Sequence, residues 1–377
     1  MAHARACDRR IFKVIVKILC IHPALAPYRL DFFNLLAERV DLEVAFVHRN
    51  AVNQKFDQRK LLSDAKFHYR YLKGFDVKGR NIRFGIRQLI RECSPDVVLS
   101  YEASPITMWL SLLKALHLGT WRLWTHMDEA PDTILSRRRI RAIVRNWVLR
   151  HCDGVMVPSK EAVKAYRSIL IPSSPSPKFA IVPIIHDTAT IRTNAKRVIE
   201  LGEEWKSAVV SNGERILLYV GRLAAVKNLY WLLDQIKQSA LSQNIITVFV
   251  GDGPEREGLK SKGDALGLDA RVRFEGRKDG DELYAIMSAA DALVLPSTFE
   301  PYGAVVPEAM QWGTPVLVSD KVGAKELIND GENGAVIGGD FAKTAMQVME
   351  LKKGTDSILG VELKDAVKDL VHSFSCD

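Results

Sequence analysis

The chain has 377 residues, of which 47% are hydrophobic and 26% are charged, a balance that excludes a disordered protein. This length exceeds what one hydrophobic core usually organises, so we expect two domains. No apolar run is as long as a membrane-spanning helix, which needs about 18 residues or more.

The charge is divided unequally along the chain. Residues 1–200 carry a net charge of +16 and residues 201–377 a net charge of −8, which gives the total of +8. We expect the basic half to face a polyanionic partner, with anionic lipid headgroups as the first choice. A nucleic-acid partner is not expected, because no binding module or basic-aromatic stripe is present. The five cysteines are scattered and form no C-x-x-C pair, which favours a cytoplasmic protein without structural zinc.

Apolar runs alternate with amphipathic segments along the first half. Strands are expected at Phe12–Leu19, Leu42–Val47, Asp96–Ser100, Arg122–Thr125, Gly154–Val157 and Ala180–Pro183. Helices are expected at Tyr28–Val40, Arg83–Cys93, Pro105–Leu116, Arg137–Arg150 and Ser159–Ile169. The polar segment Asn50–Lys66 lacks a clear period and is expected to be a loop.

The second half repeats this alternation, which predicts a second parallel sheet covered on both faces. Strands are expected at Ile216–Val220, Ile246–Val250, Val272–Phe274, Ala292–Leu295 and Val316–Val318. Helices are expected at Asn228–Ala240, Pro254–Leu266, Asp281–Ala289, Ala304–Gln311 and Ala324–Asn329. The boundary is expected between Asp187 and Gly213, so the predicted domains are residues 1–190 and 191–377.

The segment Phe299–Glu308 joins a buried strand to a helix through a turn that contains Gly303. Helix starts leave unpaired N–H groups and attract anions, so the amides of Gly303, Ala304 and Val305 are candidate phosphate ligands. Glu300 and Glu308 flank them, and carboxylates accept hydrogen bonds from hydroxyl groups. A phosphate cradle beside two hydroxyl acceptors suggests a nucleotide-sugar.

Two cations follow the strand Ile216–Val220. Arg222 and Lys227 lie five residues apart at a strand end, and such ends point into the ligand crevice of an open α/β sheet. Both can reach a diphosphate and stabilise the charge that builds on a departing phosphate oxygen. The alternative is that they are two surface cations in a loop.

The spacing of Glu300 and Glu308 resembles the E-x7-E signature of the retaining family 4 glycosyltransferases. Further agreement comes from Tyr219–Asn228, Val250–Glu255 and the run from Val272–Gly276 to Asn333–Gly334. The resemblance implies the GT-B fold, an α/β architecture of two Rossmann-like domains whose parallel sheets face an interdomain cleft. It also implies transfer from a UDP- or GDP-sugar to a glycan or lipid-linked acceptor, with no obligatory metal or other cofactor.

The resemblance also implies residue roles. Residues 1–190 would bind the acceptor and 191–377 the donor. Glu308 would bind ribose, Glu300 would contact the sugar, and Gly303 to Val305 would meet the diphosphate. Arg222 and Lys227 would stabilise the leaving diphosphate. Gly221, Gly253, Gly276 and Arg277 are further candidate donor contacts, although a tight turn accounts equally well for Gly253 and a solvated loop for Gly276 and Arg277.

In the first half, His126 ends an apolar run, where it could point into the cleft or serve only a structural role. Family members carry a comparable histidine near the donor sugar. His22, Tyr28 and Asp128 are acceptor-side candidates, and Asp128 could orient His126. The family's Gly-Gly turn is replaced here by His22–Tyr28, and its Pro-Asn-Gly-x-Asp turn by Pro183–Asp187.

The segment Arg137–Arg150 has helical spacing, with an apolar face and a basic remainder. Ile140, Ile143, Val144, Trp147 and Val148 form the apolar face, and Arg137, Arg138, Arg141 and Arg145 lie largely off it. Such a helix suits an anionic membrane surface, and it suits equally a core-packed helix with a solvated basic face. With the basic first half, it favours peripheral contact with the inner face of the membrane.

Three functions are compatible with these residues. The first is a membrane-associated retaining glycosyltransferase of surface polysaccharide or glycolipid biosynthesis. The second is a GT-B epimerase or phosphorylase that uses the same donor class. The third is a non-catalytic sugar-nucleotide-binding or membrane adaptor, against which the complete set of Arg222, Lys227, Glu300 and Glu308 argues.

Overall fold

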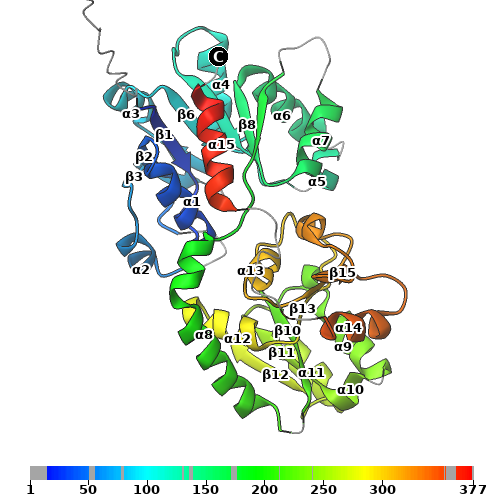
Figure 1. Cartoon of the computed structure of the whole chain (residues 1–377). Coiled ribbons are helices and arrows are strands. Elements are labelled where there is room, and N and C mark those ends of the chain that lie inside the picture. The colour runs from blue at the N-terminus through cyan, green and yellow to red at the C-terminus, as the bar shows by residue number, and fades with distance from the viewer. Residues whose placement is uncertain are drawn as a thin grey trace, which may run out of the picture.

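The structure is a computed structural model. It describes residues 15–50, 56–77, 80–129, 131–135, 139–170, 176–211, 213–239, 241–351, 353 and 362–375. Two parallel sheets, one of seven strands and one of six, form the centres of two α/β domains (Figure 1). The expected fold class, α/β with two parallel sheets, is therefore confirmed.

The first sheet has the strand order β3-β2-β1-β6-β7-β8-β9, and every neighbouring pair is parallel. Its strands are β1 (Lys17–His22), β2 (Asp41–Phe46), β3 (His68–Tyr71), β6 (Val97–Tyr101), β7 (Arg122–His126), β8 (Gly154–Val157) and β9 (Lys178–Ile181). Residues 18–22 of β1 are all buried, as expected for a central strand of a sheet with both faces covered.

The helices of this domain are α1 (Pro27–Ala37), α2 (Gln58–Ser63), α3 (Ile86–Cys93), α4 (Pro105–Ala115), α5 (Pro131–Leu135), α6 (Arg139–His151) and α7 (Lys160–Ile169). A small antiparallel hairpin, β4 (Gly74–Val77) and β5 (Arg80–Arg83), follows β3. Local sequence signals set several helix starts. Ser104 accepts a hydrogen bond from the Thr107 N–H at the start of α4, with Pro105 in the first turn.

The second sheet has the order β12-β11-β10-β13-β14-β15. Its strands are β10 (Arg215–Val220), β11 (Ile245–Val250), β12 (Val272–Gly276), β13 (Ala292–Leu295), β14 (Val316–Val318) and β15 (Gly334–Val336). Its helices are α9 (Leu229–Gln238), α10 (Leu241–Asn244), α11 (Arg256–Ala265), α12 (Gly280–Ala289), α13 (Val305–Gln311) and α14 (Phe341–Met349), with short 3-10 turns η1 (Ala225–Lys227) and η2 (Gly323–Leu327).

The chain passes between the domains twice. The first crossing, residues 182–187, leads from β9 into the long helix α8 (Thr188–Val209), and residues 182–186 are buried. After the second domain the chain returns, and α15 (Leu363–Ser375) packs on the first sheet (Figure 1). Phe374 contacts Trp124 of β7 edge to face, with ring centroids 4.9 Å apart. The returning helix thus completes the core of the first domain.

Some elements differ from the sequence-based expectation. The region where a boundary was expected forms α8, the polar segment Asn50–Lys66 contains α2, and residues 323–327 form a 3-10 turn where a helix was expected. The strands β3, β4, β5 and β15 were not predicted, because none of them shows a clear apolar run or alternation. The first strand begins at Lys17, and the start of the predicted range Phe12–Leu19 lies outside the described residues.

Candidate active site

The second domain contributes an ion pair at the carboxyl ends of its central strands. The Lys227 ammonium in η1, after β10, contacts the Glu300 carboxylate after β13. Only 17% and 16% of these two side chains are exposed. The turns that carry them are joined, since Val226 accepts hydrogen bonds from the Thr298 amide at 2.9 Å and from its hydroxyl at 3.1 Å. A partly desolvated charge pair therefore lies where an α/β sheet binds ligands.

Arg222 lies in the same loop as Lys227 but has a different environment. Its carbonyl accepts a hydrogen bond from the Tyr219 hydroxyl at 2.8 Å, which fixes the backbone, and its side chain is exposed. Within the described part of the chain, its guanidinium forms no ion pair. The structure thus joins Lys227 to Glu300 and leaves Arg222 available at the rim.

The turn before α13 presents free amides. Gly303, Ala304 and Val305 donate no backbone hydrogen bond to another described residue, whereas the next amide, that of Val306, bonds to the Gly303 carbonyl at 2.9 Å. Gly303 has φ +89°, a left-handed conformation that favours glycine. Pro307 lies in the first turn of α13, where its missing N–H leaves no bond unmade. This local sequence produces three adjacent amide donors next to Glu300.

Glycines let the neighbouring loops approach each other. A Cβ at Gly253 would lie 2.2 Å from the Leu223 carbonyl oxygen, and one at Gly251 would lie 2.0 Å from the Gly221 carbonyl oxygen. Close loop packing is therefore sufficient reason for glycine at both positions. Gly276 has φ +68° with open space around it, a conformational reason for glycine.

Arg277, next to Gly276, is exposed, and its guanidinium lies over the Phe56 ring of the first domain, 5.7 Å from the centroid. This contact places the loop after β12 against the first domain.

The first domain contributes two stacked histidines. His22 ends β1 and His126 ends β7, and their rings are nearly parallel with centroids 4.8 Å apart. Both are buried, and Tyr101 at the end of β6 packs beside His126. The ring of His126 is packed in the core at the carboxyl end of its strand, and its cleft-facing role remains a prediction.

Hydrogen bonds fix the protonation of this pair. The Nδ1 atoms of His22 and His126 lie 3.0 Å and 3.1 Å from the carbonyl oxygens of Ala24 and Ser100. A carbonyl only accepts, so each Nδ1 carries the proton and each Nε2 remains an acceptor. Burial lowers the pKa of His126 to about 4, and it lowers the pKa of His22 well below its ordinary value. Both rings are therefore neutral near pH 7.

Asp128 follows β7 and pairs with Arg29 of α1, with Nη2 and Oδ2 2.6 Å apart. Burial opposes the charge of Asp128, but Arg29 outweighs this effect and holds the pKa of the carboxyl below its usual value. Tyr28 precedes Arg29, and burial, together with the charges of Asp128 and Glu308, raises the pKa of its phenol. Asp128 thus bonds to Arg29, and it acts on His126 only through its charge.

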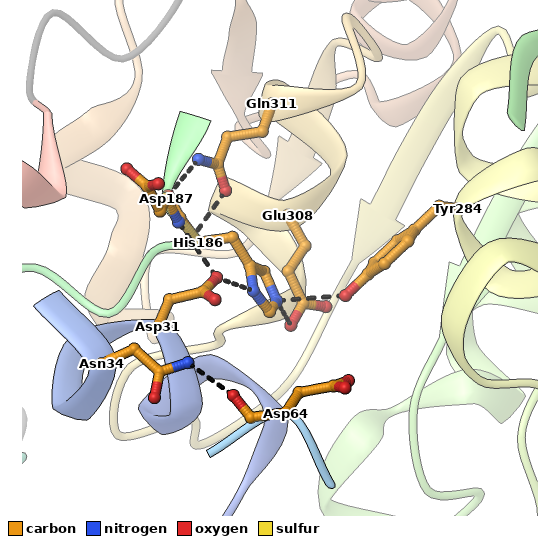
Figure 2. A network of polar contacts seen from close by, with 8 residues as sticks. All are labelled: Asp31, Asn34, Asp64, His186, Asp187, Tyr284, Glu308 and Gln311. Atoms are coloured by element: carbon orange, nitrogen blue, oxygen red, sulfur yellow. Dashed lines mark hydrogen bonds and ion pairs between the residues drawn. The ribbon is translucent and has the colours of Figure 1, made fainter. Parts of the chain in front are cut away.

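His186, in the first interdomain crossing, joins α1 to α13 (Figure 2). Its Nδ1 lies 2.9 Å from Asp31 Oδ2, and its Nε2 lies 3.5 Å from Glu308 Oε1 and 3.1 Å from the Tyr284 hydroxyl. Burial opposes protonation of this ring, but the hydrogen bonds to Asp31 and Glu308 prevail and raise the pKa of His186 to about 9. The imidazolium therefore bridges one carboxylate from each domain.

Sequence reasoning did not identify Asp31, His186, Tyr284 or Gln311 as site residues. His186 could have been found from the segment Pro183–Asp187, which replaces the family's Pro-Asn-Gly-x-Asp turn and places a histidine beside an aspartate in an apolar turn. Its partners are 155 residues away on one side and 122 on the other, and no local pattern predicts such pairing.

Comparison with known proteins finds a family model that matches the second half of the chain. Residues 203–357 match the family of glycosyl transferases group 1. The matched residues lie in the second half of the chain and make up less than half of its length. The match includes Lys227, Glu300 and Glu308, whereas the histidine pair lies outside it.

Part of the chain is similar to two curated proteins. The chain is 36% identical over 129 residues to an uncharacterized glycosyltransferase of Methanocaldococcus jannaschii, which covers 34% of this chain and 33% of that protein. It is 28% identical over 166 residues to the lipopolysaccharide core biosynthesis glycosyltransferase LpsE of Rhizobium meliloti, which covers 41% of this chain and 47% of the relative. The matched region thus spans between a third and a half of these relatives.

Solved structures share the whole fold. Anabaena HepE in complex with UDP covers 96% of this chain and 100% of its own, with a TM-score of 0.73 and 17% identity. The lipopolysaccharide outer core galactosyltransferase WaaB covers 95% and 99%, with a TM-score of 0.67 and 19% identity. These likenesses show that both domains of this chain adopt the expected GT-B fold.

His186 also helps to line a cavity of about 220 Å³. Apolar residues of both domains line it, including Leu30, Leu61, Ile191 and Trp312, with aspartates such as Asp281 among them. Its lining does not include Lys227 or Glu300, so it is separate from the strand-end site. Among the described residues, no cluster of three or more His, Cys, Asp or Glu side chains is placed to hold a metal ion.

Proposed function

We propose that this protein is a retaining glycosyltransferase that moves a sugar from a nucleotide-sugar to a glycan or lipid-linked acceptor, in surface polysaccharide or glycolipid biosynthesis. The observation that carries this proposal is the ion pair of Lys227 and Glu300 beside three free amides. A cation and amide donors suit a leaving diphosphate, and a carboxylate suits sugar hydroxyls.

In this proposal the second domain holds the donor. The amides of Gly303, Ala304 and Val305 and the ammonium of Lys227 take up the charge that forms as the bond between sugar and phosphate breaks. Arg222 reaches the same diphosphate from the rim. Glu308 accepts from ribose hydroxyls, and Glu300 accepts from the sugar. Because Lys227 is already paired with Glu300, it is held in place before the donor arrives.

The first domain supplies neutral acceptors. The Nε2 atoms of His22 and His126 can accept hydrogen bonds from hydroxyl groups of the donor sugar or the acceptor. Asp128, held by Arg29, and Tyr28 are the further candidates for contact with the acceptor. Attack on the same face as the departing diphosphate retains the anomeric configuration, and the diphosphate itself helps to remove the proton from the attacking hydroxyl.

The test is turnover with purified protein. A panel of UDP- and GDP-sugars is incubated with glycan and lipid-linked acceptors, and the product is analysed by mass spectrometry and by NMR of its anomeric proton. We expect a product of unchanged anomeric configuration that forms only when acceptor is present.

Three other outcomes would contradict the proposal. Conversion of the nucleotide-sugar without acceptor would indicate an epimerase. Phosphate-dependent cleavage of a glycan would indicate a phosphorylase. Donor binding without any turnover would indicate an adaptor.

We also propose that the first domain contacts an anionic membrane from the cytoplasmic side. On α6, Ile140 is 80% exposed and Ile143 is 68% exposed, with Trp147 beside them and Arg141 exposed between. Leu112 of the neighbouring helix α4 and Leu116, which directly follows that helix, are also exposed. Apolar side chains with basic neighbours suit a lipid interface. No described helix is both long and apolar enough to cross a bilayer.

The predicted amphipathic pattern of α6 needs one change. Val148 is buried in the core, and Arg145 is also buried, where it donates to the Ile134 carbonyl and pairs with Glu129. The expectation that Arg145 belongs to a basic face is therefore wrong. Arg137 and Arg138 lie outside the described residues.

Sedimentation with lipid vesicles tests this contact. We expect binding to vesicles that contain phosphatidylglycerol, weaker binding to phosphatidylcholine alone, and loss of about tenfold or more in affinity for Ile143→Glu. Ile199→Glu, at an exposed isoleucine of α8, is the matched control. Equal binding of Ile143→Glu and wild type would remove α6 from the contact.

A further inference from the structure

His186 is buried where the chain crosses between the domains, and it interacts with three helices (Figure 2). Asp31 belongs to α1 of the first domain, whereas Glu308 and Tyr284 belong to α13 and α12 of the second. The backbone is held as firmly as the ring. Gln311 of α13 accepts from the His186 N–H at 3.1 Å and donates to its carbonyl at 2.8 Å.

Asp31 is the anchor on the first-domain side. Its Oδ2 accepts from the His186 ring and also from the Asp187 amide at 3.1 Å, so it binds both the ring and the crossing backbone. Asn34 of the same helix donates to the Asp64 carbonyl at 3.0 Å and accepts from the Lys66 amide at 2.7 Å. The helix that carries Asp31 is thus fixed within its own domain.

Glu308 is the other end of the bridge. Glu308 pairs with His186 through Oε1, and within the described part of the chain this is its one ion pair. A carboxylate that interacts through one oxygen leaves its second oxygen able to bind a ligand. The partner of the first oxygen sets the orientation of the whole carboxylate.

We propose that His186 is a positioning residue that orients the Glu308 carboxylate toward the ribose of the donor and ties that orientation to the first domain through Asp31. This inference rests on the proposed function, because it takes Glu308 as the ribose acceptor. Without the imidazolium, two partly buried carboxylates would face each other without a cation between them, and Glu308 would turn toward water.

The coupling works in both directions. Ribose binding favours the Glu308 orientation that His186 supports, and this orientation requires Asp31 and therefore the present arrangement of the two domains. By linkage, an arrangement of the domains that breaks the Asp31 contact weakens ribose binding by the same factor by which ribose binding favours the present arrangement.

The test measures how much the ribose hydroxyls contribute to binding. UDP and GDP are compared by calorimetry, and the tighter of the two is then compared with its 2′,3′-dideoxy analogue. We expect wild type to prefer the ribose form by about tenfold or more, as for a hydrogen bond to a charged group. Glu308→Gln should lose most of this preference, and His186→Gln should lose it to within about threefold of equality.

The dideoxy analogue separates positioning from general damage. A positioning role predicts that His186→Gln binds the dideoxy analogue nearly as wild type does. The double variant with Glu308→Gln should then lose no further preference, because the two residues act as one unit. His68→Gln, at an exposed histidine of β3, is the matched control and should retain the full preference.

An unchanged preference in His186→Gln would overturn the inference, and so would an equal loss of affinity for both nucleotides. If wild type shows no preference for the ribose form over the dideoxy analogue, the inference is also overturned, because Glu308 then does not bind ribose. Turnover in the acceptor assay would still support the proposed function in each of these cases. If His186→Gln lacks a cooperative melting transition, Asp31→Asn supplies the comparison, and it must lower the preference in the same direction.

Discussion

The two domains differ in the polar groups at the carboxyl ends of their strands, which we call the first-domain wall (His22 and His126) and the second-domain wall (Lys227, Glu300 and the free amides). The first-domain wall has two stacked, neutral histidines whose protons are already committed to backbone carbonyls. The second-domain wall has a charged pair, Lys227 and Glu300, beside free amides. One wall is suited to accept hydrogen bonds from hydroxyl groups, and the other to receive negative charge.

The groups at the strand ends of each domain are the opposite of what the net charge of that half of the chain would suggest. The half with a net charge of +16 contributes the uncharged wall, and the half with −8 contributes the lysine. Net charge therefore describes the outer surface of each domain and says little about the site. The placement of a few buried groups decides the chemistry.

Loss of the charged wall should have the largest effect. Lys227→Met removes the cation that would stabilise the departing diphosphate, and we expect turnover to fall by about 100- to 1000-fold. Steady-state kinetics with saturating donor measure this effect. Lys260→Met, at an exposed lysine of α11, is the control and should retain wild-type turnover. A loss below tenfold for Lys227→Met would place the main stabilisation elsewhere.

Loss of the neutral wall should have a smaller effect. His126→Phe keeps an aromatic ring in the stack and removes the Nε2 acceptor, so we expect roughly a tenfold to 100-fold fall in kcat/KM. Each factor of ten corresponds to about 1.4 kcal/mol of lost transition-state stabilisation. His22→Phe removes the neighbouring acceptor and should affect the acceptor KM more than the donor KM. His68→Phe is the matched control. Wild-type kinetics in both variants would assign the pair a structural role only.

The pH dependence of stability should separate the contribution of His126 from that of His186. These effects are the smallest that we expect, but they distinguish the two residues. The pKa of His126 is about 4 in the folded state against about 6.5 when unfolded, so the unfolded chain takes up the proton first. Stability should therefore fall as the pH drops from 6.5 toward 4. The pKa of His186 is raised to about 9, so its contribution is complete below about 6.5 and is lost as the pH rises through 9.

Melting temperatures between pH 4 and pH 10 measure both limbs. His126→Phe should flatten the acid limb, and His186→Gln should flatten the alkaline limb. The groups that face His186 are Asp31 from α1, Glu308 from α13 and Tyr284 from α12. Burial raises the pKa of Tyr284 above its usual value, so it keeps its proton over this range. An unchanged alkaline limb in His186→Gln would show that another group titrates there.

Sequence patterns predicted the frame of this molecule well. Long apolar strands such as β10 and β11, and glycine-marked turns such as that before α13, depend on residues close together in the chain. They were therefore placed within a few residues of their observed positions. The ion pair of Lys227 and Glu300 joins two positions that were singled out separately as strand-end residues. The roles proposed for both residues remain predictions until variants are measured.

Contacts between the domains could not be predicted in this way. The bridge through His186 depends on how two separately folded units pack, and its partners Asp31 and Glu308 lie in segments with no shared pattern. The same limit applies to Arg29, a residue of the basic first half that is buried against Asp128. Burial of charge is a property of the packed structure, and composition does not reveal it.

The return of α15 to the first sheet has a consequence for how the protein is made. The second sheet and its helices are contiguous in the chain, whereas the first core lacks Leu363, Val367, Leu370 and Phe374 until these residues have been synthesised. On the ribosome, the domain that is translated second should therefore be the first to become resistant to protease. Stalled chains of increasing length would reveal the order, and early protection of residues 15–181 would contradict it.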